Sequence, residues 1–140
     1  MLTHVERTSL YTVVHLVPSG EADAIYALLR KERVFAGATI TYDRGSELAL
    51  WKLIEKATGS SIFFADAHSP WQRPKNENTN GRLRRVFPKR YDFSTLTDKD
   101  IKRTVYLMNH TKRKSLLWRT PCEVYGRCCG SGGIALLFCV

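Results

Sequence analysis

Long hydrophobic runs are missing from this sequence of 140 residues. No stretch of about 18 apolar residues occurs, so we expect no membrane-spanning helix. The opening residues, MLTHVERTSLY, contain no apolar core followed by a small-residue cleavage site, so we expect no secretory signal either. These absences favour a cytoplasmic protein. The length and the 44% share of hydrophobic residues predict one globular domain with a real core.

Cysteine is absent before position 122. The four cysteines follow the spacing C-x5-C-C-x9-C, with no C-x2-C pair and no histidine nearby, which excludes the common zinc-binding patterns. Disulfides are not expected without a secretion signal. We therefore interpret these cysteines as incidental.

Acidic residues are scarce in one block of the chain. Between Trp71 and Arg119 there are 14 Lys and Arg against 4 Asp and Glu, a net charge of +10, whereas the remainder has 8 against 9, a net charge of −1. All of the excess positive charge, +9 in total, therefore lies in this block. Such a block indicates a polyanionic partner, nucleic acid first, although a solvated face that aids solubility is the alternative.

The apolar pattern predicts four strands and four helices. The β-rich runs indicate strands, and apolar residues at helical spacing, such as Ile25 and Leu29, indicate helices. Thr97 with Asp100 resembles a capping box, and Gly59 suits a helix end. The expected strands span about 2–7, 9–17, 38–43 and 60–66, and the helices span about 21–34, 47–58, 75–87 and from 97 onward. Their order favours an α/β domain with partly parallel pairing. After Val124 we find neither a helical nor a strand pattern.

Two acids stand where a site would form. Asp43 ends one predicted strand, and Glu77 begins a helix after the next strand. Ligand sites in open α/β sheets gather at the carboxyl ends of strands, so these carboxylates could converge there. Paired carboxylates that hold two divalent ions are one solution for phosphoryl transfer. The alternatives are a turn-forming Asp43 and a Glu77 placed by the helix dipole.

The predicted helix that carries Glu77 has two faces. Asn80, Gly81 and Arg84 share the side of Glu77, which suits a metal beside phosphates. The opposite side is expected to pack on the sheet through Leu83, Val86 and Phe87.

Four segments make the sequence recognisable. TYDRGSE (41–47), FFADAHSPWQRPKNENTNGRLRR (63–85), FPKRYDFS (87–94) and RKSLLWRTPCEV (113–124) resemble the catalytic domain of bacterial insertion-sequence transposases of the IS-thirty family. The resemblance covers about residues 3–124. It implies a DDE enzyme of DNA transposition and integration on an RNase H-like fold, which cleaves and joins strands with magnesium or manganese. It places the second aspartate of the triad at Asp43 and the glutamate at Glu77, with the family's spacing of 33 residues between them.

The chain also departs from this family. The first aspartate of the triad lies upstream of the segment that matches Val5–Arg7, and residues 1–140 hold no counterpart. Its strand is the central one, so we expect an incomplete mixed sheet that either closes up or exposes unpaired edges. Residues 1–124 are then a partial catalytic core, truncated at the N-terminus, and residues 125–140 are an unmatched tail. Pro74 and Lys75 replace a Gly-Ser-like pair.

These observations leave two functions open. One is a DDE transposase part that binds DNA and is inactive alone, with a divalent metal held weakly if at all. The other is a non-catalytic module that binds DNA or inhibits a full-length transposase. DNA is the expected partner, with a transposase or a second copy possible and no membrane or small molecule expected. Glu6 and Asp23 are alternative candidates for the missing acid, but nothing in the sequence places them at the site. The expected nucleic-acid contacts are Arg44, Arg73, Lys75, Asn76, Asn80, Arg84 and Arg85.

Overall fold

The chain forms a mixed α/β structure around a single five-stranded sheet. The computed structural model describes residues 1–17, 21–31, 37–42, 48–66, 74–88, 97–129 and 136–139. The elements in chain order are β1 (Leu2–Glu6), β2 (Thr12–His15), α1 (Ala22–Leu29), β3 (Thr39–Tyr42), α2 (Trp51–Thr58), β4 (Ser61–Phe64), α3 (Pro74–Val86), α4 (Asp98–His110), a 3₁₀ turn (Lys114–Leu116), α5 (Pro121–Cys129) and β5 (Leu136–Cys139).

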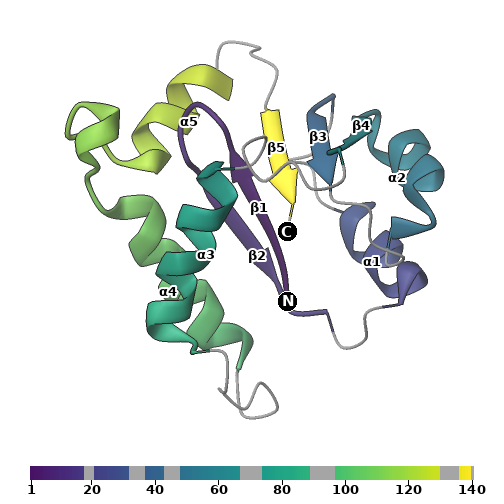
Figure 1. Ribbon diagram of the computed structural model, residues 1–140, viewed down its shortest axis with the longest axis horizontal. Coiled ribbons are helices and arrows are strands. Elements are labelled where there is room, and N and C mark those ends of the chain that lie inside the picture. Colours follow the sequence, from purple (N-terminus) through teal and green to yellow (C-terminus); the bar gives the residue numbers. More distant parts are fainter. Residues whose placement is uncertain are drawn as a thin grey trace.

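The strand order is β2-β1-β5-β3-β4. β1 and β2 form an antiparallel hairpin, and β3 and β4 form a parallel pair connected through α2. β5 joins the two halves, because it is antiparallel to β1 and parallel to β3, and its Phe138 is in register with both Val5 and Thr41. Figure 1 shows β5 between the purple hairpin and the blue strands β3 and β4.

The central place in the sheet is therefore filled, and the expectation of an incomplete sheet was wrong. Neither of the two expected outcomes, closure of the halves or an open gap, is observed. The residues that fill the place come from the tail after Val124, in which the sequence shows neither a helical nor a strand pattern. Its apolar run, LLFC, forms a strand with neighbours on both edges. Strands in the middle of a sheet often consist of consecutive apolar residues. They therefore lack the alternation of apolar and polar residues that identifies a half-buried strand in a sequence.

Helix α5 was also missed, although its start carries a recognisable signal. Thr120 Oγ1 accepts a hydrogen bond from the Glu123 amide at 3.2 Å, and the Glu123 carboxylate accepts one from the Thr120 amide at 2.9 Å. This is a capping box, with Pro121 at the first helical position, where its missing N–H costs nothing. The letters TPCE could have predicted this helix.

Other local predictions are confirmed. The capping box of Thr97 and Asp100 opens α4, and Gly59 ends α2 in the left-handed region with a φ of 67°. The first two helices are shorter than expected, because α1 ends at Leu29 and α2 begins only at Trp51. The predicted start of the second helix near Ser46 lies outside the described residues.

The core lies on both halves of the sheet. The larger cluster joins Ile25 and Leu29 of α1, Ile40 and Tyr42 of β3, and Ile54 of α2, all 3% exposed or less. A smaller cluster joins Phe87, just after α3, and Ile101 of α4 to partly buried Val14 of β2 and to Leu16 and Val105. Helices α1 and α2 thus stand beside the β3–β4 half, and α3, α4 and α5 stand beside the hairpin (Figure 1). Among the described residues, no helix has the length and apolar character needed to span a bilayer.

Candidate nucleic-acid interface and carboxylate site

The two predicted carboxylates fall at the margins of what the structure describes. β3 ends at Tyr42, so Asp43 follows it directly in the sequence but lies outside the described residues. Glu77 is the fourth residue of α3, where the helix backbone is described and the side chain is not. The convergence of the two carboxylates therefore stays a prediction. Within the described part of the chain, no group of three or more His, Cys, Asp or Glu residues could hold a metal ion.

The predicted nucleic-acid contacts also differ in how much of each residue the structure describes. Arg44 and Arg73 lie outside the described residues. Lys75 and Asn76 belong to the first turn of α3, where only the backbone is described. Asn80 is half-buried, and Arg84 and Arg85 are exposed on the later turns of the same helix.

Helix α3 has one buried stripe and one polar face. Thr79, Leu83 and Phe87 are each 6% exposed or less, and their spacing of four residues places them on one side of the helix. Gly81 and Arg84, on the face that the sequence assigns to Glu77, are exposed. Val86 was expected to pack on the sheet, but it is 51% exposed, so that expectation was wrong. The actual stripe is narrower and leaves Val86 facing a groove beside α4.

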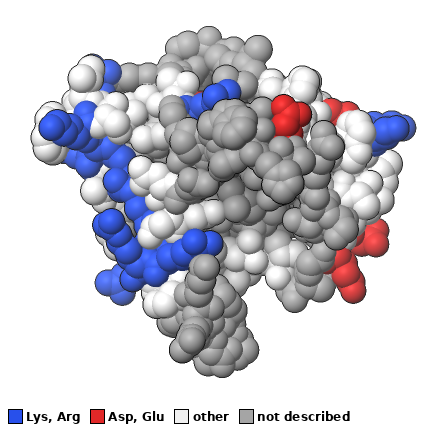
Figure 2. All heavy atoms as spheres, viewed as in Figure 1, with Lys and Arg blue, Asp and Glu red and all other residues white. Residues whose placement is uncertain are grey.

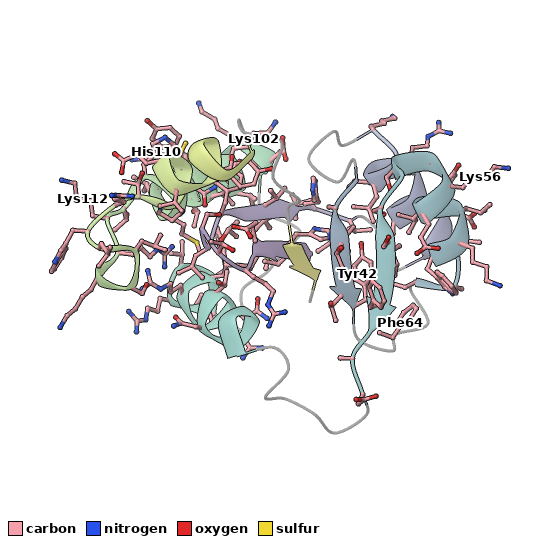
Figure 3. All side chains as sticks on the ribbon, turned by 90° about the horizontal axis from the view of Figure 1, so that it is seen from above. Tyr42, Lys56, Phe64, Lys102, His110 and Lys112 are labelled. Atoms are coloured by element: carbon pink, nitrogen blue, oxygen red, sulfur yellow. The ribbon has the colours of Figure 1, made fainter. Side chains whose placement is uncertain are left out.

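The described cations form a basic surface, defined here as the exposed Lys and Arg residues of α3, α4 and the turn that follows α4. Figure 2 shows blue atoms along the left-hand side, which α3, α4 and α5 occupy in Figure 1, and the larger red groups to the right. In the view from above, Lys102, His110 and Lys112 lie toward one end of the molecule and Lys56 lies at the other (Figure 3). The basic surface comprises Arg84, Arg85, Lys99, Lys102, Arg103, Lys112, Lys114 and Arg119.

Buried arginine adds to the positive potential under this surface. Arg113 is only 7% exposed, and its Nη2 donates a hydrogen bond to the carbonyl of Met108 at 2.9 Å. Burial, with the nearby charge of Arg82, lowers the pKa of the Arg113 guanidinium. Arg82 belongs to α3 and Arg113 to the turn after α4, so positive charge from both elements acts at this point. An anion near this point would relieve the repulsion between them.

A groove of about 480 Å³ separates α3 from α4. Arg82 and Arg103 contribute to its walls, and Val86, Leu107 and Met108 add apolar surface. Asp100 also lines it, but that carboxylate is engaged with Thr97 in the capping box. The groove therefore offers cations above apolar side chains, as the surfaces that hold nucleic-acid backbones do.

Comparison with known proteins gives consistent results. The transposase for insertion sequence element IS1086 of Cupriavidus metallidurans is 38% identical over 106 residues, which are 76% of this chain and 29% of that protein. Transposase InsI for insertion sequence element IS30A of Escherichia coli K12 is 33% identical over 138 residues, 96% of this chain and 35% of that protein. The transposase for insertion sequence element IS4351 of Bacteroides fragilis is 34% identical over 112 residues, 80% of this chain and 34% of that protein.

The chain belongs to the bacterial insertion-sequence transposases. It spans about a third of the length of these relatives. No established family profile matches it. The relationship agrees with the resemblance that the four sequence segments indicated. The alignment to the Escherichia coli transposase covers 96% of the chain, and a domain boundary after Val124 stays a prediction.

Glu6 has a structural role in this chain. Its carboxylate accepts hydrogen bonds from the amides of Thr8 and Ser9 at 2.9 and 2.5 Å and from the Ser9 hydroxyl at 2.5 Å, and Glu6 is 3% exposed. It closes the turn between β1 and β2. Glu6 of β1 and Ile40 of β3 are both in register with the same residue of β5, Leu137. Ile40 precedes Asp43 by three residues in the chain. Asp23 is exposed in the first turn of α1. Neither acid is placed as a substitute ligand.

Part of the basic surface was not singled out from the sequence. The expected DNA contacts stopped at Arg85, whereas the described cations continue through α4 and the turn beyond it. The charge count already extended to Arg119, and this signal could have identified Lys112, Lys114 and Arg119.

Proposed function

We propose that this chain is a DNA-binding part of a transposase catalytic core that does not cut DNA as a polypeptide of these 140 residues. The observation that carries the proposal is the basic surface. Eight exposed cations lie on two helices and a turn of one half of the molecule, while the other half is nearly neutral. Phosphate contacts from such a surface supply most of the affinity of sequence-independent DNA binding.

The sheet supports an RNase H-like fold as part of this proposal. In that fold a central strand joins the antiparallel hairpin to the parallel pair. β5 has both relationships, since it is antiparallel to β1 and parallel to β3. It takes the place that the resemblance assigns to the strand with the first aspartate. Its residues, Leu136–Cys139, include no acid, so the central strand supplies no carboxylate.

Asp43 and Glu77 are the residues that would hold a divalent metal. Carboxylate oxygens are the donors that magnesium and manganese prefer, so the residue types fit. When bound, such ions balance charge on the attacking and leaving oxygens of an in-line displacement at phosphorus. Asp43 and Glu77 would orient the phosphate, and the basic surface would hold the flanking DNA. With two of three carboxylates, the polypeptide binds but does not complete the displacement.

The proposal is tested by measuring binding and cleavage on one preparation. Fluorescence anisotropy with a labelled duplex should show binding that needs no metal and is retained in Asp43→Ala and Glu77→Ala. A plasmid nicking assay with magnesium or manganese should show no cleavage. Metal-dependent nicking that disappears in both variants would show a complete active site and overturn the inactivity. Absence of duplex binding at low salt would overturn the DNA-binding function itself.

A further inference from the structure

Two large apolar side chains project from the basic turn after α4. Leu117 is 80% exposed and Trp118 is 66% exposed, the highest values among the described large hydrophobic residues. Isolated exposed apolar residues are ordinary. Two adjacent ones, one of them a tryptophan, leave a large apolar surface in water. Within the described part of the chain, the Trp118 ring packs against no other aromatic ring.

The backbone holds this pair in place. The Arg113 amide donates to the Arg119 carbonyl at 3.0 Å, and the Trp118 amide donates to the Arg113 carbonyl at 2.9 Å, which closes the turn at its base. Leu117 and Trp118 have φ values of 54° and 61°. This left-handed region is unfavourable for residues with a Cβ atom. The turn is thus tied down at one end and presents its apolar tip at a free-energy cost.

The surroundings of the tip are cationic. Lys112, Lys114 and Arg119 are exposed on the turn, and none of them forms an ion pair with another residue of the described segments. The base of the turn is the buried Arg113, which lies near Arg82 of α3. An aromatic side chain among unpaired cations is the combination that binds single-stranded nucleic acid, since the cations attract phosphates and the ring stacks on a base.

We propose that Trp118, with Leu117 beside it, stacks on DNA bases that have left the helical stack. In an intact duplex the faces of the bases are covered by their neighbours, so an indole ring gains little from it. An unpaired base exposes its face, and leucine can fill the gap that it leaves. The turn therefore gives the chain a preference for DNA with unpaired bases. This inference rests on the proposed DNA binding and adds the feature that is recognised.

The test compares two labelled DNAs, an intact duplex and the same duplex with an internal loop of unpaired bases. The wild-type chain should bind the looped duplex roughly tenfold or more tightly than the intact one, the range expected for one or more stacked bases. Trp118→Ala should remove most of this preference and leave binding of the intact duplex nearly unchanged. Trp118→Phe should retain much of it, because phenylalanine also stacks.

Phe63→Ala is the matched control. Phe63 is 56% exposed on β4, at the edge of the sheet that lies away from the basic surface, and its loss should not change the preference. Circular dichroism should confirm that every variant is folded. Equal preference in the wild-type chain and Trp118→Ala would overturn the inference and leave the proposed DNA binding intact. Equal weakening on both DNAs would also overturn it and would indicate a general contact. No binding to either DNA would contradict both proposals.

Discussion

His4 is a buried histidine whose protonation is strongly coupled to this fold. It is completely buried on β1, with Nε2 3.3 Å from the Tyr42 hydroxyl and its ring edge-on to His15. Burial, followed by the neighbouring His15, lowers the pKa of His4 from 6.5 to about 3. The folded chain therefore keeps His4 neutral, whereas the unfolded chain protonates it below about pH 6.5.

The free energy of unfolding should fall as the pH drops below 6.5, because the unfolded state then binds a proton that the folded state excludes. The slope should steepen below pH 6.5 and approach about 1.4 kcal/mol per pH unit near pH 5, in a window in which most carboxylates remain ionised. Urea denaturation across this range measures it. His4→Gln should flatten the dependence, and His110→Gln, on the exposed end of α4, should not. An equal slope in wild type and His4→Gln would contradict this account.

Asn109 protects the edge of the sheet. β2 is an edge strand, and the Asn109 side chain of α4 accepts a hydrogen bond from the Thr12 amide at 2.9 Å and donates one to the Thr12 carbonyl at 2.8 Å. Both residues are 3% exposed or less. The Asn109 side chain thus makes the two hydrogen bonds that a neighbouring strand would make with Thr12. It pairs a buried backbone N–H and C=O that would otherwise lack partners.

Replacing Asn109 by Ala should lower the free energy of unfolding by about 2–3 kcal/mol, because two buried backbone groups lose their partners. Asn78→Ala is the control, since Asn78 is exposed on α3, and its effect should stay within about 0.5 kcal/mol. Both values come from urea denaturation at neutral pH. A change below 1 kcal/mol in Asn109→Ala, by the same scale, would show that water reaches Thr12.

At the scale of elements, local signals predicted most helices and strands, but not how the sheet is completed. Thr97 with Asp100, and Gly59, identified helix ends because capping is a property of neighbouring residues. The strand Leu136–Cys139 could not be found in this way. Its partners, β1 and β3, lie about a hundred residues away in the chain, and a short apolar run has no period that separates strand from helix. The site was predicted from matched motifs, and the convergence of Asp43 and Glu77 stays a prediction because Asp43 and the Glu77 side chain lie outside what the structure describes.

Strand β5 should be essential for a soluble fold. Without it, the facing edges of β1 and β3 would expose unpaired backbone groups. Phe138→Pro should cost about 3 kcal/mol or more, since proline cannot donate a ladder hydrogen bond in a central strand. Phe138→Val keeps the backbone amide and serves as the control. Thermal melting followed by circular dichroism should show a lower midpoint and aggregation for the proline variant. Equal melting of both variants would show that β5 is dispensable.

At the scale of the whole molecule, charge is separated between the two halves of the sheet. The half with α1 and α2 holds few exposed cations, Lys52 and Lys56 among them, while α3, α4 and the turn beyond carry the basic surface. The block of positive charge between Trp71 and Arg119, known from the sequence, predicted a polyanion partner. The spatial separation follows from the fold, because the basic block of sequence forms the helices beside the hairpin and the neutral remainder forms most of the other half.

The salt dependence of duplex binding tests this central claim most directly. Removing two phosphate contacts with the double variant Arg84→Ala, Arg85→Ala should reduce the slope of log K against log salt by about 2, since each contact contributes about 0.9. The double variant Lys52→Ala, Lys56→Ala on α2 removes the same charge from the other half and should leave the slope close to that of the wild-type chain. Equal slopes for the two double variants would contradict binding through the basic surface and indicate that only total charge matters.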